Sequence, residues 1–387
     1  MNILYIYSSN INPMKGGVQR VTQVLCDYFR SKGHLCYYLS TQQSNEGIEN
    51  QFALPSQDVL CSENIDYLTS FVEDKQIDVV VNQDGFNKGL SKLVFHSCRC
   101  KVITVAHNSL TSPVDKFTIV RHSYFKKKHL SWFLPLFDTS LAKFFMKMLY
   151  RRKYRQHYLD IVKKSFRFVL LSNAYKKELD FFIGNNENDN VCAIPNPCTI
   201  DYEKTDEIAK EKVVLYVGRV SFSQKRNDLL LKVWQRLESK HSDWTLKIVG
   251  DGSDMQLLKD IAADMNLHSV EFLGFRNPIQ YYKQASIFCL TSAYEGFVLV
   301  LVEAMKYKCV PICFDSFGAA SDIIYNGIDG YLVKPFDLEE YSSRLNTLMS
   351  DNALLRKMSV QANIKSSEFD IDTIGNQWLN LFSNKEK

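Results

Sequence analysis

The segment Ser286–Asp315, SIFCLTSAYEGFVLVLVEAMKYKCVPICFD, decides the fold class. SIFCLTS and VPICFD have the short apolar runs of buried strands, and only Ala293–Cys309 lies between them. The valines of that stretch favour a strand by propensity. Parallel neighbours in a sheet, however, need a crossover of about a dozen residues, which is usually helical. We therefore predict a helix that begins near Phe297 and ends between Lys306 and Lys308, with tertiary context overriding propensity.

The same alternation of apolar strands and amphipathic helices fills the chain and predicts an α/β protein with parallel sheets. It pauses where two prolines flank Asn196 and a polar, charged stretch follows. A chain of 387 residues is also long for a single core. We place a domain boundary there. Residues 1–200 and 201–368 are expected to form two Rossmann-like domains, and residues 369–387 a C-terminal helix.

The composition indicates in which compartment the protein is found. No apolar run reaches the roughly 18 residues that cross a bilayer, and the first ten residues, MNILYIYSSN, lack the pattern of a signal peptide. The ten cysteines contain no CxxC pair, so they indicate reduced thiols rather than a zinc site or a disulfide framework. The sequence predicts a cytoplasmic protein.

Positive charge is concentrated in residues 116–167. This segment contains 14 Lys or Arg against two Asp or Glu, whereas the whole chain carries only +4. The cations alternate with Phe, Trp, Leu and Met, a mixture that suits the surface of an anionic bilayer. Nucleic acid is the competing anionic partner, but no nucleic-acid-binding signature accompanies the charge. The alternative without a binding function is that this segment forms a solvated pair of helices with one packed face. We expect peripheral attachment to the inner face of the cytoplasmic membrane.

Two glutamates border the valine run. In open α/β sheets, ligands bind beyond the carboxyl ends of the strands, where Glu295 lies. Gly296 allows close approach of a ligand, and the following helix N-terminus favours anions. Glu303 stands on an otherwise apolar helix, where a buried carboxylate needs hydrogen-bond donors such as sugar hydroxyls. Taken alone, the pair would more often be a loop charge and an ion-pair partner.

Other strand ends carry further candidates. Arg219 follows the first strand of the second half, with Lys225 six residues on, and both side chains suit a diphosphate. Gly16 and Gly17 stand between the first strand and the first helix, in a second anion-tolerant loop. His107 follows another strand. The alternatives are solvated surface cations, an ordinary turn and a structural histidine.

Together these residues resemble glycosyltransferase family 4, retaining enzymes of GT-B architecture. The resemblance covers nearly the whole chain. It is carried by GGVQRVT, AHN, IPNP, YVGR with the following QK, VGDG, FLGF and, most specifically, EGFVLVLVEAMKYKCVPICFDSFGAASDIIYNGIDGYLV. It implies two Rossmann-like domains that face each other across a cleft, with the acceptor bound by residues 1–200 and the nucleotide sugar by residues 201–368. It also implies that residues 369–387 pack back on the first domain.

The resemblance assigns four residues to the reacting centre. Arg219 and Lys225 would bind the donor diphosphate, and Glu295 and His107 would contact the donor sugar. The remaining assignments concern the rest of the nucleotide sugar: Glu303 at the ribose, Phe275 and Arg276 near the base, and Gly16, Gly17, Gly296 and the amides of Phe297 and Val298 at the phosphates. Val298 departs from the family, in which Gly, Pro or Ser is frequent at this position.

The function implied is a retaining hexosyltransferase that uses a UDP-sugar, with a GDP-sugar as the alternative. Its acceptor would be an oligosaccharide or a lipid-linked glycan of lipopolysaccharide, capsule or exopolysaccharide. A nucleotide-sugar epimerase of GT-B-like fold and a catalytically silent nucleotide- or glycan-binding subunit are the competing interpretations. We expect no cofactor and no metal, because the D-x-D pattern of Asp370–Asp372 precedes a terminal helix and is explained as a helix cap.

Overall fold

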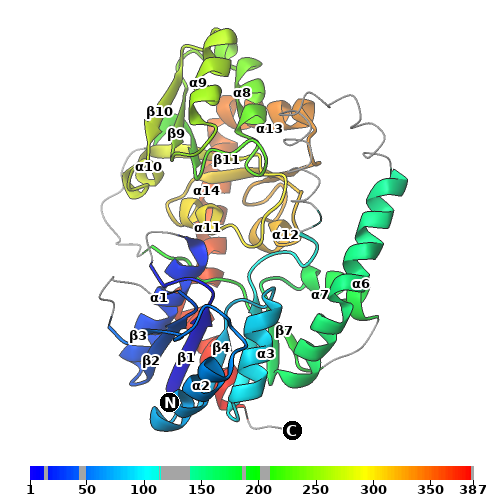
Figure 1. The fold of residues 1–387 in the computed structure, drawn as a ribbon. Helices are drawn as coiled ribbons and strands as arrows, with labels where there is room; N and C mark the ends of the chain where they lie inside the picture. The colour runs from blue at the N-terminus through cyan, green and yellow to red at the C-terminus, as the bar shows by residue number, and fades with distance from the viewer. Residues whose placement is uncertain are drawn as a thin grey trace. The chain divides into compact units, whose positions relative to one another are not determined.

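The computed structural model describes residues 1–12, 16–42, 49–112, 114, 140–184, 189–200 and 210–384. The chain forms two compact units (Figure 1). The first contains Met1–Leu110, Phe144–Thr199 and Asp370–Lys387, and the second contains Thr111–Lys143 and Ile200–Phe369. Residues 116–139 of the basic segment predicted from the sequence lie outside the described residues.

The first unit is built on a seven-stranded sheet in which every neighbouring pair is parallel. From one edge to the other its strands are β3 (Gln51–Ala53), β2 (Leu35–Ser40), β1 (Asn2–Tyr7), β4 (Val79–Asn82), β5 (Lys101–Ala106), β6 (Arg167–Leu170) and β7 (Val191–Ala193). The chain moves outward from β1 to β3 and then, on the other side, from β4 to β7. The strand order therefore reverses between β1 and β4, which is where α/β sheets bind ligands.

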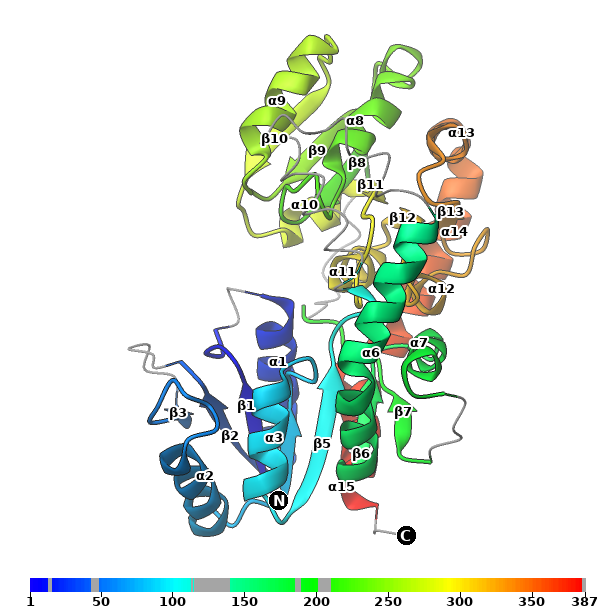
Figure 2. The ribbon, with the colours of Figure 1, turned by 45° about the vertical axis from the view of Figure 1, so that its right-hand side comes forward.

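Six helices accompany this sheet among the described residues. They are α1 (Gly17–Ser31), α2 (Ser62–Asp74), α3 (Lys88–Ser97), α6 (Ser140–Lys164), α7 (Ala174–Ile183) and α15 (Ile371–Ser383). Helices α3 and α6 lie side by side, where the Lys88 ammonium donates to the carbonyl of Lys153 at 2.6 Å (Figure 2). Among the helices that the structure describes, α6 included, none is long and apolar enough to cross a membrane.

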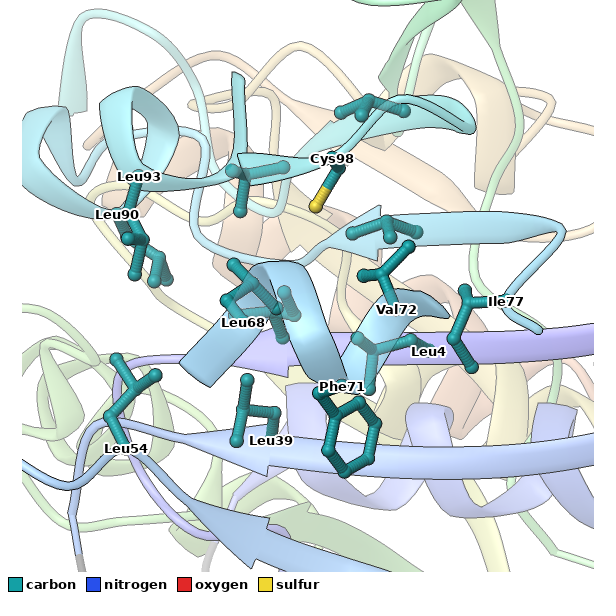
Figure 3. Close-up of a cluster of buried hydrophobic side chains, with 14 residues drawn as sticks. Leu4, Leu39, Leu54, Leu68, Phe71, Val72, Ile77, Leu90, Leu93 and Cys98 are labelled. Atoms are coloured by element: carbon teal, nitrogen blue, oxygen red, sulfur yellow. The ribbon is translucent and has the colours of Figure 1, made fainter. Parts of the chain in front are cut away.

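One face of this sheet is covered by α2 and α3. Figure 3 shows the resulting core, in which Leu68 and Phe71 of α2 lie over Leu4 of β1 and Leu39 of β2. Leu90 and Leu93 of α3 extend the cluster. These leucines are no more than 2% exposed. Their burial supplies much of the free energy that holds the strand ends in place.

The other face carries Tyr5 and Tyr38, and α1 lies over it with Arg30 stacked 5.5 Å from the Tyr38 ring. Helix α15 then packs on α1. The Phe29 and Phe382 rings meet edge to face at 5.4 Å, and the Tyr28 hydroxyl donates to Asn376 at 2.9 Å. A Cβ at Gly375 would lie 2.3 Å from the Tyr28 ring, so a glycine is needed for this close approach.

The second unit contains a six-stranded sheet, which is also parallel throughout. Its strands, edge to edge, are β10 (Val270–Gly274), β9 (Thr245–Val249), β8 (Glu211–Val217), β11 (Ala285–Leu290), β12 (Val310–Phe314) and β13 (Tyr331–Val333). The order reverses between β8 and β11. Its helices are α8 (Asn227–Gln235), η2 (Glu238–Lys240), α9 (Met255–Asp264), α10 (Ile279–Gln284), α11 (Leu299–Lys306), α12 (Ala320–Ile323), α13 (Leu338–Ser350), α14 (Asn352–Ser366) and η3 (Ser367–Phe369).

The valine-rich crossover forms the predicted helix between β11 and β12. Helix α11 ends at Lys306, within the predicted range, but begins at Leu299 rather than near Phe297. Val298 is the N-cap residue and is extended, with φ −95° and ψ 91°. Leu301 and Val302 are fully buried, so packing rather than propensity holds this segment helical.

Candidate active site

Three glycines mark the carboxyl ends of strands β8, β9 and β10. Gly218, Gly250 and Gly274 all have positive φ, at 149°, 137° and 67°. The amide of Gly218 donates to Val249, and that of Gly250 to Gly274. A Cβ at Gly250 would stand 1.9 Å from the Gly218 carbonyl oxygen. The loops after these strands therefore pack backbone to backbone, which fixes the base of the loop that carries Arg219.

The loop after β8 is also tied to the loop after β11. The amide of Ala293 donates to the carbonyl of Gln224 at 2.7 Å. The buried Thr291 hydroxyl lies 3.1 and 2.9 Å from the carbonyls of Lys225 and Arg226. Arg226 is left-handed, with φ 50°, and precedes α8. Lys225 and Glu295 are thus brought together at the point where the strand order of this unit reverses.

Four polar side chains meet there. The Lys225 ammonium donates to Glu295 Oε1 at 2.5 Å, with the two side chains 15% and 9% exposed. The Gln224 amide donates to Glu295 Oε2 at 3.3 Å. Gln224 Oε1 in turn accepts from the exposed Arg219 guanidinium at 3.0 Å. The structure therefore brings Arg219, Lys225 and Glu295 into one network, in which Gln224 is the link.

Glu303 lies within α11 and is fully buried. Its Oε2 accepts a hydrogen bond of 2.9 Å from the hydroxyl of Tyr282, a buried residue of α10. A carboxylate in this position is stabilised by such donors because burial alone would disfavour its charge. The prediction that a carboxylate stands inside an apolar helix holds, and Tyr282 is the donor that sequence reasoning did not name.

The turn from β11 into α11 contains the other candidates at this strand end. Gly296, Phe297 and Val298 are all buried, and the Phe297 ring packs on Phe369 at 5.5 Å. Their amides precede the first turn of α11, and the N-terminus of a helix favours an anion.

Phe275 and Arg276 follow β10 and are both exposed, Phe275 at 71%. An aromatic ring left this open is available to a planar partner. Gly274, left-handed directly before them, turns the chain away from the strand.

In the first unit, Gly16 and Gly17 join the loop after β1 to α1, and Gly16 is the N-cap residue. His107 directly follows β5. Its Nε2 is hydrogen-bonded to Oε1 of Gln83, which directly follows the adjacent strand β4. Burial lowers the pKa of His107 to about 4, so the imidazole is neutral at pH 7.

Within the described ranges, no group of three or more His, Cys, Asp or Glu residues is placed to bind a metal ion. Asp370 is the N-cap residue of α15, and Asp372 stands in its first turn. Asp254, another N-cap residue, accepts from the amide of Phe222 at 2.7 Å.

Two neutral amides were missed from the sequence, Gln83 and Gln224. Neither belongs to a charge pattern, and a lone glutamine carries little information. Their positions in the sequence could have identified them. Gln83 follows β4 as His107 follows β5, and Gln224 stands directly before Lys225. Neighbouring parallel strands end at the same edge, so these residues could have been paired with the charged candidates.

Residues 199–365 match the family model "Glycosyl transferases group 1". The chain is 33% identical over 197 residues to an uncharacterized glycosyltransferase of Haemophilus influenzae, an alignment that covers 50% of this chain and 56% of the relative. It is 28% identical over 192 residues, 49% of this chain and 53% of the relative, to a Campylobacter jejuni N-acetylgalactosaminyltransferase named for a GalNAc-containing glycan on PP-undecaprenol. The chain thus spans about half the length of these curated relatives.

Solved structures match over nearly the full chain. The apo form of the lipopolysaccharide outer core galactosyltransferase WaaB aligns with a TM-score of 0.71 at 17% identity, covering 98% of this chain and 99% of that one. Anabaena HepE in complex with UDP aligns with a TM-score of 0.75 at 17% identity, covering 99% and 100%. The fold of two Rossmann-like parallel-sheet units, as in GT-B glycosyltransferases, is thereby confirmed.

Proposed function

We propose that this protein is a retaining glycosyltransferase that moves a sugar from a nucleoside-diphosphate sugar to a cell-surface glycan. One observation carries the proposal: Arg219, Lys225 and Glu295 form one network where the strand order of the second unit reverses. That place in an α/β sheet binds nucleotides, and these side chains suit a diphosphate beside a sugar. The family match of residues 199–365 and the names of the relatives support the same chemistry.

The reaction breaks the bond between an anomeric carbon and an oxygen of the diphosphate, which gains negative charge as it leaves. The oxygen of an acceptor hydroxyl forms the new bond to that carbon on the same face, and its proton passes to the departing diphosphate. Arg219 and Lys225 stabilise that charge, and they do so more strongly in the transition state than in the ground state. Without a donor, the Lys225 ammonium is paired with Glu295. When the donor binds, the same ammonium also donates a hydrogen bond to a phosphate oxygen. These two cations supply charge that a metal ion supplies in other transferases, and we expect no metal requirement.

The other candidate residues would contact the sugar, the ribose, the base and the phosphates of the donor. Glu295 accepts a hydroxyl of the sugar, Glu303 joins the Tyr282 hydroxyl in binding the ribose, and Phe275 with Arg276 lies against the base. Amides of Phe297 and Val298 contact phosphate oxygens at the start of α11. Gly16 and Gly17 of the first unit are the candidates for contacts with phosphate oxygens, and His107 is the candidate for a contact with a sugar. UDP is the favoured nucleotide, since a fold relative was solved with UDP, and GDP is the alternative.

Nucleotide binding is tested first by thermal shift with a panel of UDP- and GDP-sugars, because a ligand that binds the folded state raises its melting temperature. Release of nucleoside diphosphate is then measured with and without glycan acceptors, and the anomeric configuration of the product is read by NMR. Retention with acceptor-dependent release is expected. An epimerised free sugar would favour the epimerase, and binding without turnover of any acceptor would favour the silent subunit.

We further propose that α6 attaches the protein to an anionic membrane at the cytoplasmic face. Its first turns expose a run of apolar side chains spaced three and four residues apart: Leu141, Phe144, Phe145, Met148 and Leu149. Four exposed cations stand among and directly beyond them: Lys147, Arg152, Lys153 and Arg155. Apolar groups that enter the headgroup region beside cations that face anionic lipids are the pattern of a peripheral anchor. The undecaprenol-linked glycan in the name of a relative fits an acceptor at that surface.

Co-sedimentation with vesicles tests this attachment. We expect binding to vesicles that contain phosphatidylglycerol, weaker binding at 0.5 M salt, and none to pure phosphatidylcholine. Phe144→Ser with Phe145→Ser should weaken binding at both salt concentrations. Leu257→Ser, at another exposed apolar position, is the matched control. Full solubility with anionic vesicles at low salt would refute the anchor and leave the transferase proposal intact.

A further inference from the structure

A chain of hydrogen bonds among uncharged groups reaches His107 from inside the first unit. The Thr22 hydroxyl, fully buried in α1, donates to the carbonyl of Val18 at 2.8 Å. Gln83 Nε2 lies 3.2 Å from the same hydroxyl oxygen. Gln83 Oε1 is hydrogen-bonded to His107 Nε2. Gln83 itself is only 3% exposed, so water does not compete freely for its amide.

The direction of every bond in this chain is determined at its start. A carbonyl oxygen only accepts, so the single hydroxyl proton of Thr22 is committed to Val18. The hydroxyl oxygen can then only accept, and the group that donates to it must be the NH₂ of Gln83. The carbonyl oxygen of Gln83 is left facing His107. Since that oxygen also accepts only, the proton of the neutral imidazole must be on Nε2.

The other ring nitrogen is left as an acceptor. Nδ1 of His107 is buried and has no hydrogen-bond partner among the residues that the structure describes. A buried acceptor without a partner is rare in folded proteins and calls for a physical reason. Burial, which lowers the pKa of this histidine, also keeps Nδ1 unprotonated at pH 7. A hydroxyl group supplies the proton that Nδ1 lacks, whereas an anion cannot.

We propose that Thr22 and Gln83 are positioning residues that hold His107 as its Nε2–H tautomer, so that Nδ1 accepts a hydrogen bond from a hydroxyl of the bound sugar. The tautomer follows from the hydrogen-bond chain alone. The identity of the hydroxyl as part of a donor sugar rests on the proposed function. Thr22 and Gln83 thereby select a hydroxyl-bearing group without touching it.

The tautomer is measured in the free protein by long-range ¹H–¹⁵N spectra of a sample with ¹⁵N-labelled histidine rings, and His107 is assigned by the signals lost in His107→Asn. We expect a neutral ring with the proton on Nε2 at pH 7. Thr22→Val removes the acceptor of the Gln83 amide, so the amide can turn and a share of the Nδ1–H form should appear. Thr22→Ser keeps the hydroxyl and should restore the wild-type pattern. Gln83→Leu should also give a mixture of tautomers.

His241 provides the matched control, because its Nε2 is paired with Asn346 at 2.9 Å in the second unit. Asn346→Ala should change the His241 signals and leave those of His107 as they are. A wild-type His107 that is protonated on Nδ1 at pH 7, or one whose signals ignore both Gln83→Leu and Thr22→Val in folded protein, would overturn the proposal. The wild-type spectrum decides the tautomer even where a variant does not fold.

The ligand is tested separately by adding UDP-glucose, UDP-galactose or UDP-N-acetylglucosamine to the labelled protein, each against UDP alone. A sugar hydroxyl on Nδ1 should shift that resonance upfield with at least one UDP-sugar and not with UDP. An unshifted Nδ1 in a protein that binds and turns over a UDP-sugar would refute the hydroxyl contact. Absence of binding to every UDP-sugar would instead count against the proposed donor and leave the tautomer standing.

Discussion

Each of the two units gathers its candidate binding groups beyond the carboxyl ends of its parallel strands, and the two units hold these groups by different means. In the first unit the groups are uncharged and joined in a fixed chain from Thr22 through Gln83 to His107. In the second, Arg219, Lys225 and Glu295 are charged and joined through Gln224. A chain of uncharged groups whose hydrogen bonds can run in only one direction is suited to orienting a side chain. A network of charged groups that can exchange hydrogen-bond partners is suited to binding a diphosphate.

The supports of the two networks differ as well. The charged network is carried by loops whose backbones touch at Gly218 and Gly250. Its position therefore depends on glycine at these two places, because a side chain at Gly250 would push the loops apart. The uncharged chain depends on side chains that are present, and its strands rest on the leucine-rich core under α2 and α3. Substitutions at Gly218 and Gly250 should therefore act on the charged network through stability, and substitutions at Thr22 and Gln83 should act on the uncharged chain through hydrogen-bond geometry.

The largest effect is expected from Gly250→Ala. The new Cβ would lie 1.9 Å from a backbone oxygen, at a φ of 137° that alanine rarely adopts, so the loops after β8 and β9 must separate. We expect a loss of more than about 4 kcal/mol in the free energy of unfolding of the second unit. Denaturant titration measures it. Gly327→Ala is the matched control, because Gly327 also has positive φ, at 81°, but nothing within 4 Å; it should cost only about 1–2 kcal/mol. Equal losses would show that backbone strain, and not the contact between loops, is responsible.

A smaller effect is expected from Lys225→Met. It leaves Glu295 mostly buried without its cation, and we expect a loss of about 3 kcal/mol in unfolding free energy. Nucleotide-sugar turnover should fall at least 100-fold, because a cation that stabilises the leaving diphosphate is gone. Combining it with Glu295→Gln should restore most of the stability, since no charge is then left unpaired, but not the turnover.

Lys212→Met is the control for this pair, because Lys212 and Asp243 form an ion pair that is more than half exposed in the same unit. It should leave both stability and turnover nearly unchanged. A double variant that regained turnover together with stability would mean that Lys225 serves the fold alone.

The effect that is smallest at pH 7 concerns the first unit, and it grows as the pH falls. Burial lowers the pKa of His107 from 6.5 to about 4, so between these values the unfolded chain binds a proton that the folded chain does not. Stability should therefore fall as pH falls through this window, with His107 contributing up to about 1.4 kcal/mol per pH unit. His107→Asn should flatten the dependence of unfolding free energy on pH between 6.5 and 4. An unchanged slope would place His107 in an environment as polar as water.

Much of the fold followed from pattern, and the reasons for the misses are local. The crossover argument predicted α11 against the propensity of its valines, but it could not predict that Val298 stays extended and delays the helix to Leu299. Charge singled out Arg219, Lys225 and Glu295. Two uncharged partners, Gln224 in that network and Tyr282 beside Glu303, are recognised only when the strand ends and helices have been placed.

Helix α15 has a consequence for the order in which the chain folds during synthesis. Its residues belong to the first unit, yet they leave the ribosome after all of Ile200–Phe369. Until then Tyr28 and Phe29 of α1 lack the surface of Gly375 and Phe382 that covers them. We therefore expect the second unit to become protease-resistant on the ribosome before the first, although its sequence begins later. Nascent chains arrested with residue 369 just outside the exit tunnel should show a protected second unit and a first unit that is still cleaved.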